Sequence, residues 1–263
     1  MKRYALGSAV LAGTIAWVIL AASGIDSAPP APEIIATFSI AAVDPDTGVC
    51  GAAVASKYPA VGKVVAHARP GVGAMCTQHF GVQAWGEKAL TLLAEKKLPE
   101  EVLTDLLKPD KAPGMRQLAI IDMQGRSAQH HPVTAPVSSS YWGVMSGRFY
   151  VCQGNTLTGR EVIIAMGKAY EETKGSLADR LVAALIAADC AGGDHRGRLA
   201  AGVRVCKKDV EGYWLDMHVD KSDDAVVELH KKYIESDHAA RGEWGKLPYV
   251  HPCPNRPAPK KPG

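Results

Sequence analysis

The sequence predicts an α+β protein in which two antiparallel β-sheets stack face to face and helix pairs cover the outside, a four-layer αββα sandwich. Short apolar runs separated by tight-turn residues come in groups, and amphipathic helical runs come in groups as well. Strands grouped with strands argue against βαβ units and therefore against a parallel sheet. Stacking the two sheets and covering both outer faces with helices would bury all of these apolar runs.

The first group of strands opens with a hairpin. Strands are expected over residues 37–43 and 49–57, joined by the turn sequence Asp-Pro-Asp-Thr-Gly at 44–48. In this turn, proline presets φ, the aspartates bond nearby backbone groups and glycine supplies a positive φ. Both flanking runs are apolar and small, which is typical of strands buried on both faces.

The remaining strands follow from the same pattern of short apolar runs bounded by turn residues. They are expected over residues 63–69, 74–79, 116–123, 127–131, 141–143, 149–152, 200–206 and 213–219, with loop at 132–140 and a turn around Ser146 and Gly147.

Helices are expected where apolar residues recur at helical spacing. Pro99 and two glutamates favour the first turn of a helix over 99–107, and Ser176 with Asp179 caps a helix that Gly192 ends. The other predicted helices cover residues 86–97, 160–173 and 223–236.

Composition divides the chain into four parts. Residues 1–23 carry a positive start and an uncharged apolar run, which predicts an export signal or, if it is not cleaved, a membrane anchor. Residues 24–36 form a Pro-rich spacer, 37–238 a single globular domain and 239–263 a Pro-rich tail. The expected location is therefore periplasmic, secreted or membrane-anchored.

The charge and the cysteines exclude some classes of function. A net charge of +3, without a basic stripe interleaved with aromatics, argues against nucleic-acid binding. Some of the six cysteines are expected to pair in an oxidising compartment, but 15 connectivities are open. No Cys-x-x-Cys pair is present, and the adjacent His130 and His131 would face opposite sides of a strand, so neither a metal nor another cofactor is expected.

Seven short motifs follow one another along the chain, at residues 37–40, 53–57, 61–62, 71–74, 77–78, 153–155 and 192–198. In sequence and in order they resemble domain-of-unknown-function family 1028, which in turn resembles the N-terminal-nucleophile (Ntn) hydrolases. The similarity runs from about Thr37 to about Tyr233, and no settled activity attaches to the family name.

The resemblance implies that Thr37 is a catalytic nucleophile. In Ntn hydrolases the nucleophile is the first residue of the mature chain, and its free α-amine, with a pKa of about 7.7–8.0, accepts the hydroxyl proton. The charge of Lys57, at the end of the paired strand, would lower the pKa of this amine or of the hydroxyl. Here Thr37 follows a signal and a spacer, so a cut between Ala36 and Thr37 is required. The alternative is that Thr37 is a β-branched residue that opens a strand.

Other polar residues are expected to line the same site. Asn155 is a candidate oxyanion donor, and the arginines of the 192–198 loop could bind a carboxylate. Simpler alternatives are packing for Ser39 and Ser56, an Asx-type turn at 153–155 and a structural role for His79. The 192–198 loop could instead be a helix stop with a local Asp–Arg pair. The candidate substrate-binding residues are Ser39, Ser56, Gln78, His79, Gln153, Asp194, Arg196 and Arg198.

The resulting hypothesis is an exported amidohydrolase of the Ntn type that cleaves a C–N amide bond of a small-molecule or peptide substrate. Some members of the resembled family are joined to peptidoglycan-binding modules, which implies association with the cell envelope. The alternative is a non-catalytic binding or envelope-structural protein on the same fold. The sequence leaves homo-oligomerisation open and contains no Gly-x-Ser-x-Gly elbow of a serine hydrolase.

Overall fold

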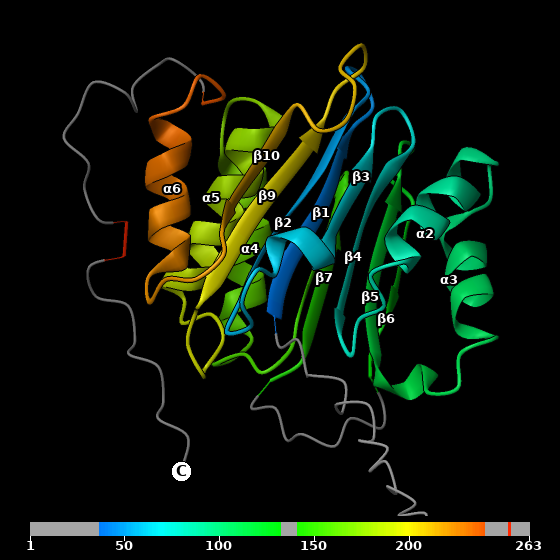
Figure 1. The fold of residues 1–263 in the computed structure, drawn as a ribbon, viewed down its shortest axis with the longest axis horizontal. Coiled ribbons are helices and arrows are strands. Elements are labelled where there is room, and N and C mark those ends of the chain that lie inside the picture. Colours follow the sequence, from blue (N-terminus) through cyan, green and yellow to red (C-terminus); the bar gives the residue numbers. More distant parts are fainter. Residues whose placement is uncertain (1–36, 133–140, 240–251, 254–263) are drawn as a thin grey trace, which may run out of the picture. The chain divides into compact units, whose positions relative to one another are not determined.

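Two antiparallel sheets form the centre of the protein in a computed structural model, which describes residues 37–132, 141–239 and 252–253 (Figure 1). The expected signal or anchor, the spacer, part of the 132–140 loop and most of the Pro-rich tail lie outside these residues. No helix within the described ranges is long and apolar enough to cross a membrane.

The larger sheet has the strand order β10-β9-β2-β1-β8-β7, so the first hairpin lies in its middle. Every neighbouring pair is antiparallel. Its strands are β1 (Thr37–Asp44), β2 (Val49–Ser56), β7 (Gly143–Gly147), β8 (Tyr150–Gly154), β9 (Ala200–Cys206) and β10 (Leu215–Val219).

The smaller sheet has the order β3-β4-β5-β6 and is also antiparallel throughout. Its strands are β3 (Ala66–Arg69), β4 (Gly73–His79), β5 (Arg116–Asp122) and β6 (Ser127–His130).

Helices cover the outer face of each sheet, which confirms the predicted four layers (Figure 1). Three pack on the larger sheet: α4 (Glu161–Glu172), α5 (Leu177–Cys190) and α6 (Ala225–Ile234). Two pack on the smaller sheet: α2 (Trp85–Ala94) and α3 (Pro99–Leu107). The short helices α1 (Gly62–Val65) and η1 (Pro113–Met115) precede β3 and β5.

Alternation along β1 assigns its side chains to two layers. Phe38 and Ile40 face the helices, whereas Ala41 and Val43 face the second sheet. By the same period of two, Thr37 lies on the face between the sheets. The space between the sheets is therefore apolar along most of β1 and polar where β1 begins.

Two predicted strand boundaries are wrong. Residues 62–65 form helix α1, because Val61, Val64 and Val65 recur at helical spacing, and Val61 and Val65 are fully buried. Strand β7 continues through Gly147, and the turn to β8 lies at the residues that follow, where Phe149 has a positive φ of 68°.

One disulfide joins Cys190, at the end of α5, to Cys253. The other four cysteines are free and buried: Cys50, Cys76, Cys152 and Cys206. Since the bond closes a sequence separation of 63 residues, we expect Cys190→Ser to lower the free energy of unfolding by roughly 2–4 kcal/mol. Urea denaturation measures the loss, and Cys152→Ser is not a suitable control because that thiol is fully buried. An unchanged transition under reducing conditions would contradict the expectation.

Candidate functional site

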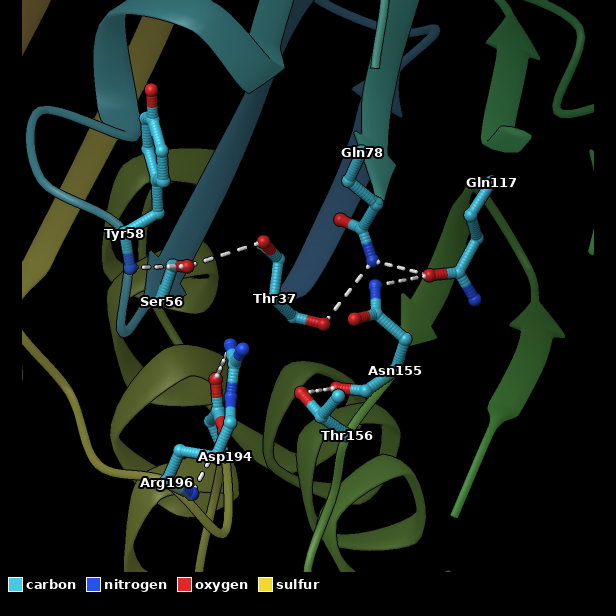
Figure 2. Close-up of polar contacts among 9 residues, drawn as sticks. All are labelled: Thr37, Ser56, Tyr58, Gln78, Gln117, Asn155, Thr156, Asp194 and Arg196. Atoms are coloured by element: carbon cyan, nitrogen blue, oxygen red, sulfur yellow. Dashed lines mark hydrogen bonds and ion pairs between the residues drawn. The ribbon is translucent and has the colours of Figure 1, made fainter. Parts of the chain in front are cut away.

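The site lies at the end of the inter-sheet layer where β1 begins, and Thr37 is its centre (Figure 2). Thr37 is fully buried, and its hydroxyl donates to Ser56 Oγ at 3.3 Å. This contact follows from the antiparallel register, which pairs Thr37 with Ser56. The backbone N–H of Tyr58 also donates to Ser56 Oγ, at 2.9 Å, which fixes that serine beside the threonine.

The backbone carbonyl of Thr37 is held from two directions. It accepts the backbone N–H of Asn155 at 2.9 Å and Nε2 of Gln78 at 3.2 Å. Asn155 follows β8 in the same sheet, whereas Gln78 comes from β4 in the opposite sheet. The start of β1 is thus fixed to both sheets, so the orientation of Thr37 is determined by the fold.

Four buried side-chain amides surround this point. Gln117 Oε1 accepts both Gln78 Nε2 and Asn155 Nδ2 at 2.8 Å, and Gln117 Nε2 donates to Gly154 O at 3.0 Å. Ser39 Oγ donates to Gln78 Oε1 at 2.6 Å, and Gln153, the cross-strand partner of Ser39, donates to Cys76 O at 3.2 Å. Such a connected network rigidifies the end of the sandwich.

Sequence reasoning missed Gln117, which is the centre of this network. Its signal was a polar residue directly before the apolar run 118–121 of β5, where the register places it opposite Gln78. It also missed Thr156, a fully buried residue with a positive φ of 52° whose hydroxyl donates to Asn155 O at 2.7 Å. Backbone strain of this kind at a non-glycine residue gathers at functional sites.

The predicted glycine–arginine loop lies against this network. The backbone N–H of His195 donates to Thr156 O at 2.9 Å, and that of Leu199 donates to Ser56 O at 2.7 Å. Within the loop, Arg196 forms a bidentate ion pair with the buried Asp194, with Nη2 to Oδ2 at 2.9 Å. In Figure 2 this pair lies below Thr37 and Ser56, and the guanidinium points toward them.

Gly193 lets this loop approach the sheet. Its φ is +54°, and a Cβ there would lie 3.0 Å from a ring carbon of Phe38, the neighbour of Thr37. A larger residue would push the loop away from the start of β1.

His79 lies at the same end of the sandwich. It ends β4, is fully buried and has a positive φ of 63°. Its Nδ1 lies 2.9 Å from Met115 O, and its ring packs against those of Phe80 and Trp142. Burial lowers the pKa of His79, and the charges of Arg196 and Arg116 lower it further, so the ring is neutral at pH 7.

Two residues, Lys57 and Arg198, were expected beside Thr37 or in the lining of its pocket, and their contacts in the structure differ from this. Lys57 follows β2 at a bend, is exposed, and makes no hydrogen bond or ion pair within the described part of the chain. Ser56 holds the position beside the Thr37 hydroxyl, because side chains alternate along a strand. Arg198 is buried and forms an ion pair with the fully buried Asp189 on α5, so its contact is with the scaffold beneath the loop.

A thiol does not provide a second nucleophile here. Burial raises the pKa of Cys76 to about 12, and that of Cys50 to about 12 as well, so both stay protonated at neutral pH. Among the described residues, no group of three or more His, Cys, Asp or Glu could hold a metal ion. The chemistry that the site offers is that of hydroxyls, amides, a neutral imidazole and a guanidinium.

A cavity of about 600 Å³ lies away from Thr37, among the helices on the outside of the larger sheet. Its lining includes Val182 and Ile186 of α5 and Tyr233 of α6, and none of the predicted site residues contributes to it.

Acid should destabilise the protein through its buried histidines. Burial lowers the pKa values of His67, His79 and His230 below the ordinary value of 6.5. Below pH 6.5 the unfolded chain therefore binds protons that the folded chain does not, so stability is complete above this pH and falls below it. We expect the urea midpoint to drop between pH 7 and 5.5, and less so in His67→Gln/His230→Gln. A flat profile would contradict this.

The layered fold and the buried site together define an αββα sandwich protein with a threonine-centred polar site. The chain belongs to a family of unknown function, DUF1028, whose model matches residues 37–229.

A solved relative confirms the fold. The crystal structure of protein SPO2555 from Silicibacter pomeroyi, also a DUF1028 member, superposes with a TM-score of 0.68 at 28% sequence identity. The alignment covers 84% of this chain and 98% of that one. No curated protein matches the sequence.

Proposed function

We propose that this protein is an exported amidohydrolase of the N-terminal-nucleophile type that cleaves a C–N amide bond. One observation carries the proposal: Thr37 is the first residue of a central strand, and its hydroxyl and carbonyl are both held by a buried polar network. An Ntn enzyme needs its nucleophile at such a position, because the hydroxyl and the α-amine that activates it belong to one residue.

The reaction would proceed through an acyl-enzyme. After cleavage between Ala36 and Thr37, the free α-amine takes the hydroxyl proton while Oγ1 attacks the substrate carbonyl carbon. The C–N bond then breaks, the leaving amine receives that proton, and water hydrolyses the resulting threonine ester. Ser56 orients the hydroxyl, and the second N–H of Asn155 Nδ2 would donate to the oxyanion.

Export fits the disulfide between Cys190 and Cys253, since such bonds persist in oxidising compartments. In this proposal residues 1–23 are the signal, association with the cell envelope remains part of the hypothesis, and no cofactor takes part.

Mapping the first residue of the mature protein tests the proposal. Intact-mass measurement and N-terminal sequencing of the protein from its native compartment should give Thr37. A mature chain that begins at Gly24 or Met1 would leave Thr37 without a free amine. Such a result would favour the non-catalytic binding protein instead.

A further inference from the structure

The site contains buried acceptor atoms that have no hydrogen-bond partner among the described residues. They are Asn155 Oδ1, His79 Nε2 and Gln153 Oε1, and all three residues are fully buried. A buried polar atom without a partner costs about 1–3 kcal/mol, so such atoms are rare unless a ligand or another group satisfies them.

The hydrogen-bond network determines whether these atoms are donors or acceptors. Gln117 must direct its NH₂ group toward the carbonyl of Gly154, so its Oε1 faces the other amides. Asn155 then presents Nδ2 to that oxygen, which leaves Oδ1 as the atom without a partner. Gln153 is oriented in the same manner by the carbonyl of Cys76. Each orphan amide atom is therefore an acceptor.

The Nε2 atom of His79 is an acceptor as well. A carbonyl cannot donate, so the Nδ1 atom beside Met115 O carries the proton, and Nε2 of the neutral ring is an acceptor.

Asn155 and His79 lie at the same end of the sandwich. His79 follows Gln78, which shares the acceptor Gln117 Oε1 with Asn155. Trp142, whose ring lies 4.9 Å from that of His79, precedes Gly143, and Gly143 pairs with Gly154 next to Asn155. Gln153 lies one row deeper on the same face as Ser39.

We propose that the substrate is a small primary carboxamide or ureide whose N–H groups donate to Asn155 Oδ1 and His79 Nε2. This assignment of substrate class rests on the proposed amidohydrolase function. A donor-rich NH₂ group matches acceptors that the protein leaves unpaired, whereas an ester or a tertiary amide brings no donor. Sites that hydrogen-bond a substrate N–H reject analogues that lack it, because their own buried groups then stay unpaired. The scissile bond is the C–N bond of this carboxamide or ureide.

Calorimetric binding of matched probes to the mature protein tests the substrate class. Benzamide and phenylurea carry the N–H donors, and N,N-dimethylbenzamide has the same ring and carbonyl without them. We expect benzamide to bind at least about 10-fold more tightly than its dimethyl counterpart. His79→Phe and Asn155→Leu should reduce this ratio to about 2-fold or less. His67→Phe, at a buried histidine on β3 that packs against Gly86 of α2, should preserve it.

The ratio of the two benzamide affinities in the wild-type protein tests the substrate class even where a variant fails to fold. Equal affinity for the two benzamides, or no binding of either N–H probe, would overturn the assignment. Release of ammonia from benzamide or phenylurea, and of dimethylamine from the dimethyl probe, reports separately on the proposed function. Selective binding without turnover would support the substrate class and count against catalysis. Turnover of the dimethyl probe at the benzamide rate would support catalysis and count against the substrate class.

Discussion

Thr37→Ala should abolish amide hydrolysis, with a loss of at least about 1,000-fold, because the substitution removes the only atom proposed to attack the substrate. If the cut between Ala36 and Thr37 is autocatalytic, the same variant should also keep its leader, and intact mass would reveal the longer chain. Thr37→Ser should retain both activities, since it keeps a hydroxyl and an α-amine on one residue.

A control on the same hairpin separates chemistry from folding. Thr47 lies in the exposed turn between β1 and β2, where its hydroxyl donates to Asp44 at 2.7 Å. Thr47→Ala should leave processing and hydrolysis unchanged. Should Thr37→Ala hydrolyse amides as well as the wild-type protein, the hydroxyl is not the nucleophile, whatever residue begins the mature chain.

The layered architecture could be predicted because local signals and packing agree. The turn at 44–48 specifies the first hairpin, and its small apolar strands require cover on both faces, which the helices and the second sheet provide. Boundaries were predicted less well where one residue type suits two structures. The valines before β3 fit a strand by their branching but form a helical turn by their spacing.

Part of the site could be predicted because its residues lie at strand ends and in a glycine-rich loop. The network was not predictable from single residues, since it depends on which side chains the opposite sheet brings near Thr37. Gln117 is distant from Asn155 in sequence and meets it only through the stacking of the two sheets. Lys57 illustrates the reverse, because it lies at an exposed bend one residue beyond the end of β2, whereas Ser56, the last residue of that strand, is buried beside Thr37.

The apolar and polar ends of the inter-sheet layer have different roles. Around Ala41 and Val43 the sheets meet through aliphatic side chains, which supplies stability. Around Thr37 they meet through hydrogen-bonded amides, whose geometry is directional. The polar site, which needs fixed orientation, thus lies at the edge of the inter-sheet layer. The apolar part of that layer supplies the buried surface without it.

Arg198→Met should be the most destabilising single change in the loop that borders the site. It removes one partner of a buried ion pair and leaves the fully buried carboxylate of Asp189 without its cation. Breaking a buried pair in this way typically costs 3–5 kcal/mol, because the remaining charge stays desolvated. Urea denaturation at pH 7 should therefore show a loss of about that size in the free energy of unfolding.

Two further variants show whether the charge itself is the cause. Arg160, which pairs with Glu161 on the surface, has a side chain that is 73% exposed, and Arg160→Met should change stability by less than about 1 kcal/mol. Asp189→Leu/Arg198→Met removes both charges and should recover most of the loss. If the double variant is as unstable as Arg198→Met alone, lost packing rather than an uncompensated charge explains the effect. In that case the ion pair does not hold the Gly192–Arg198 loop against the start of β1.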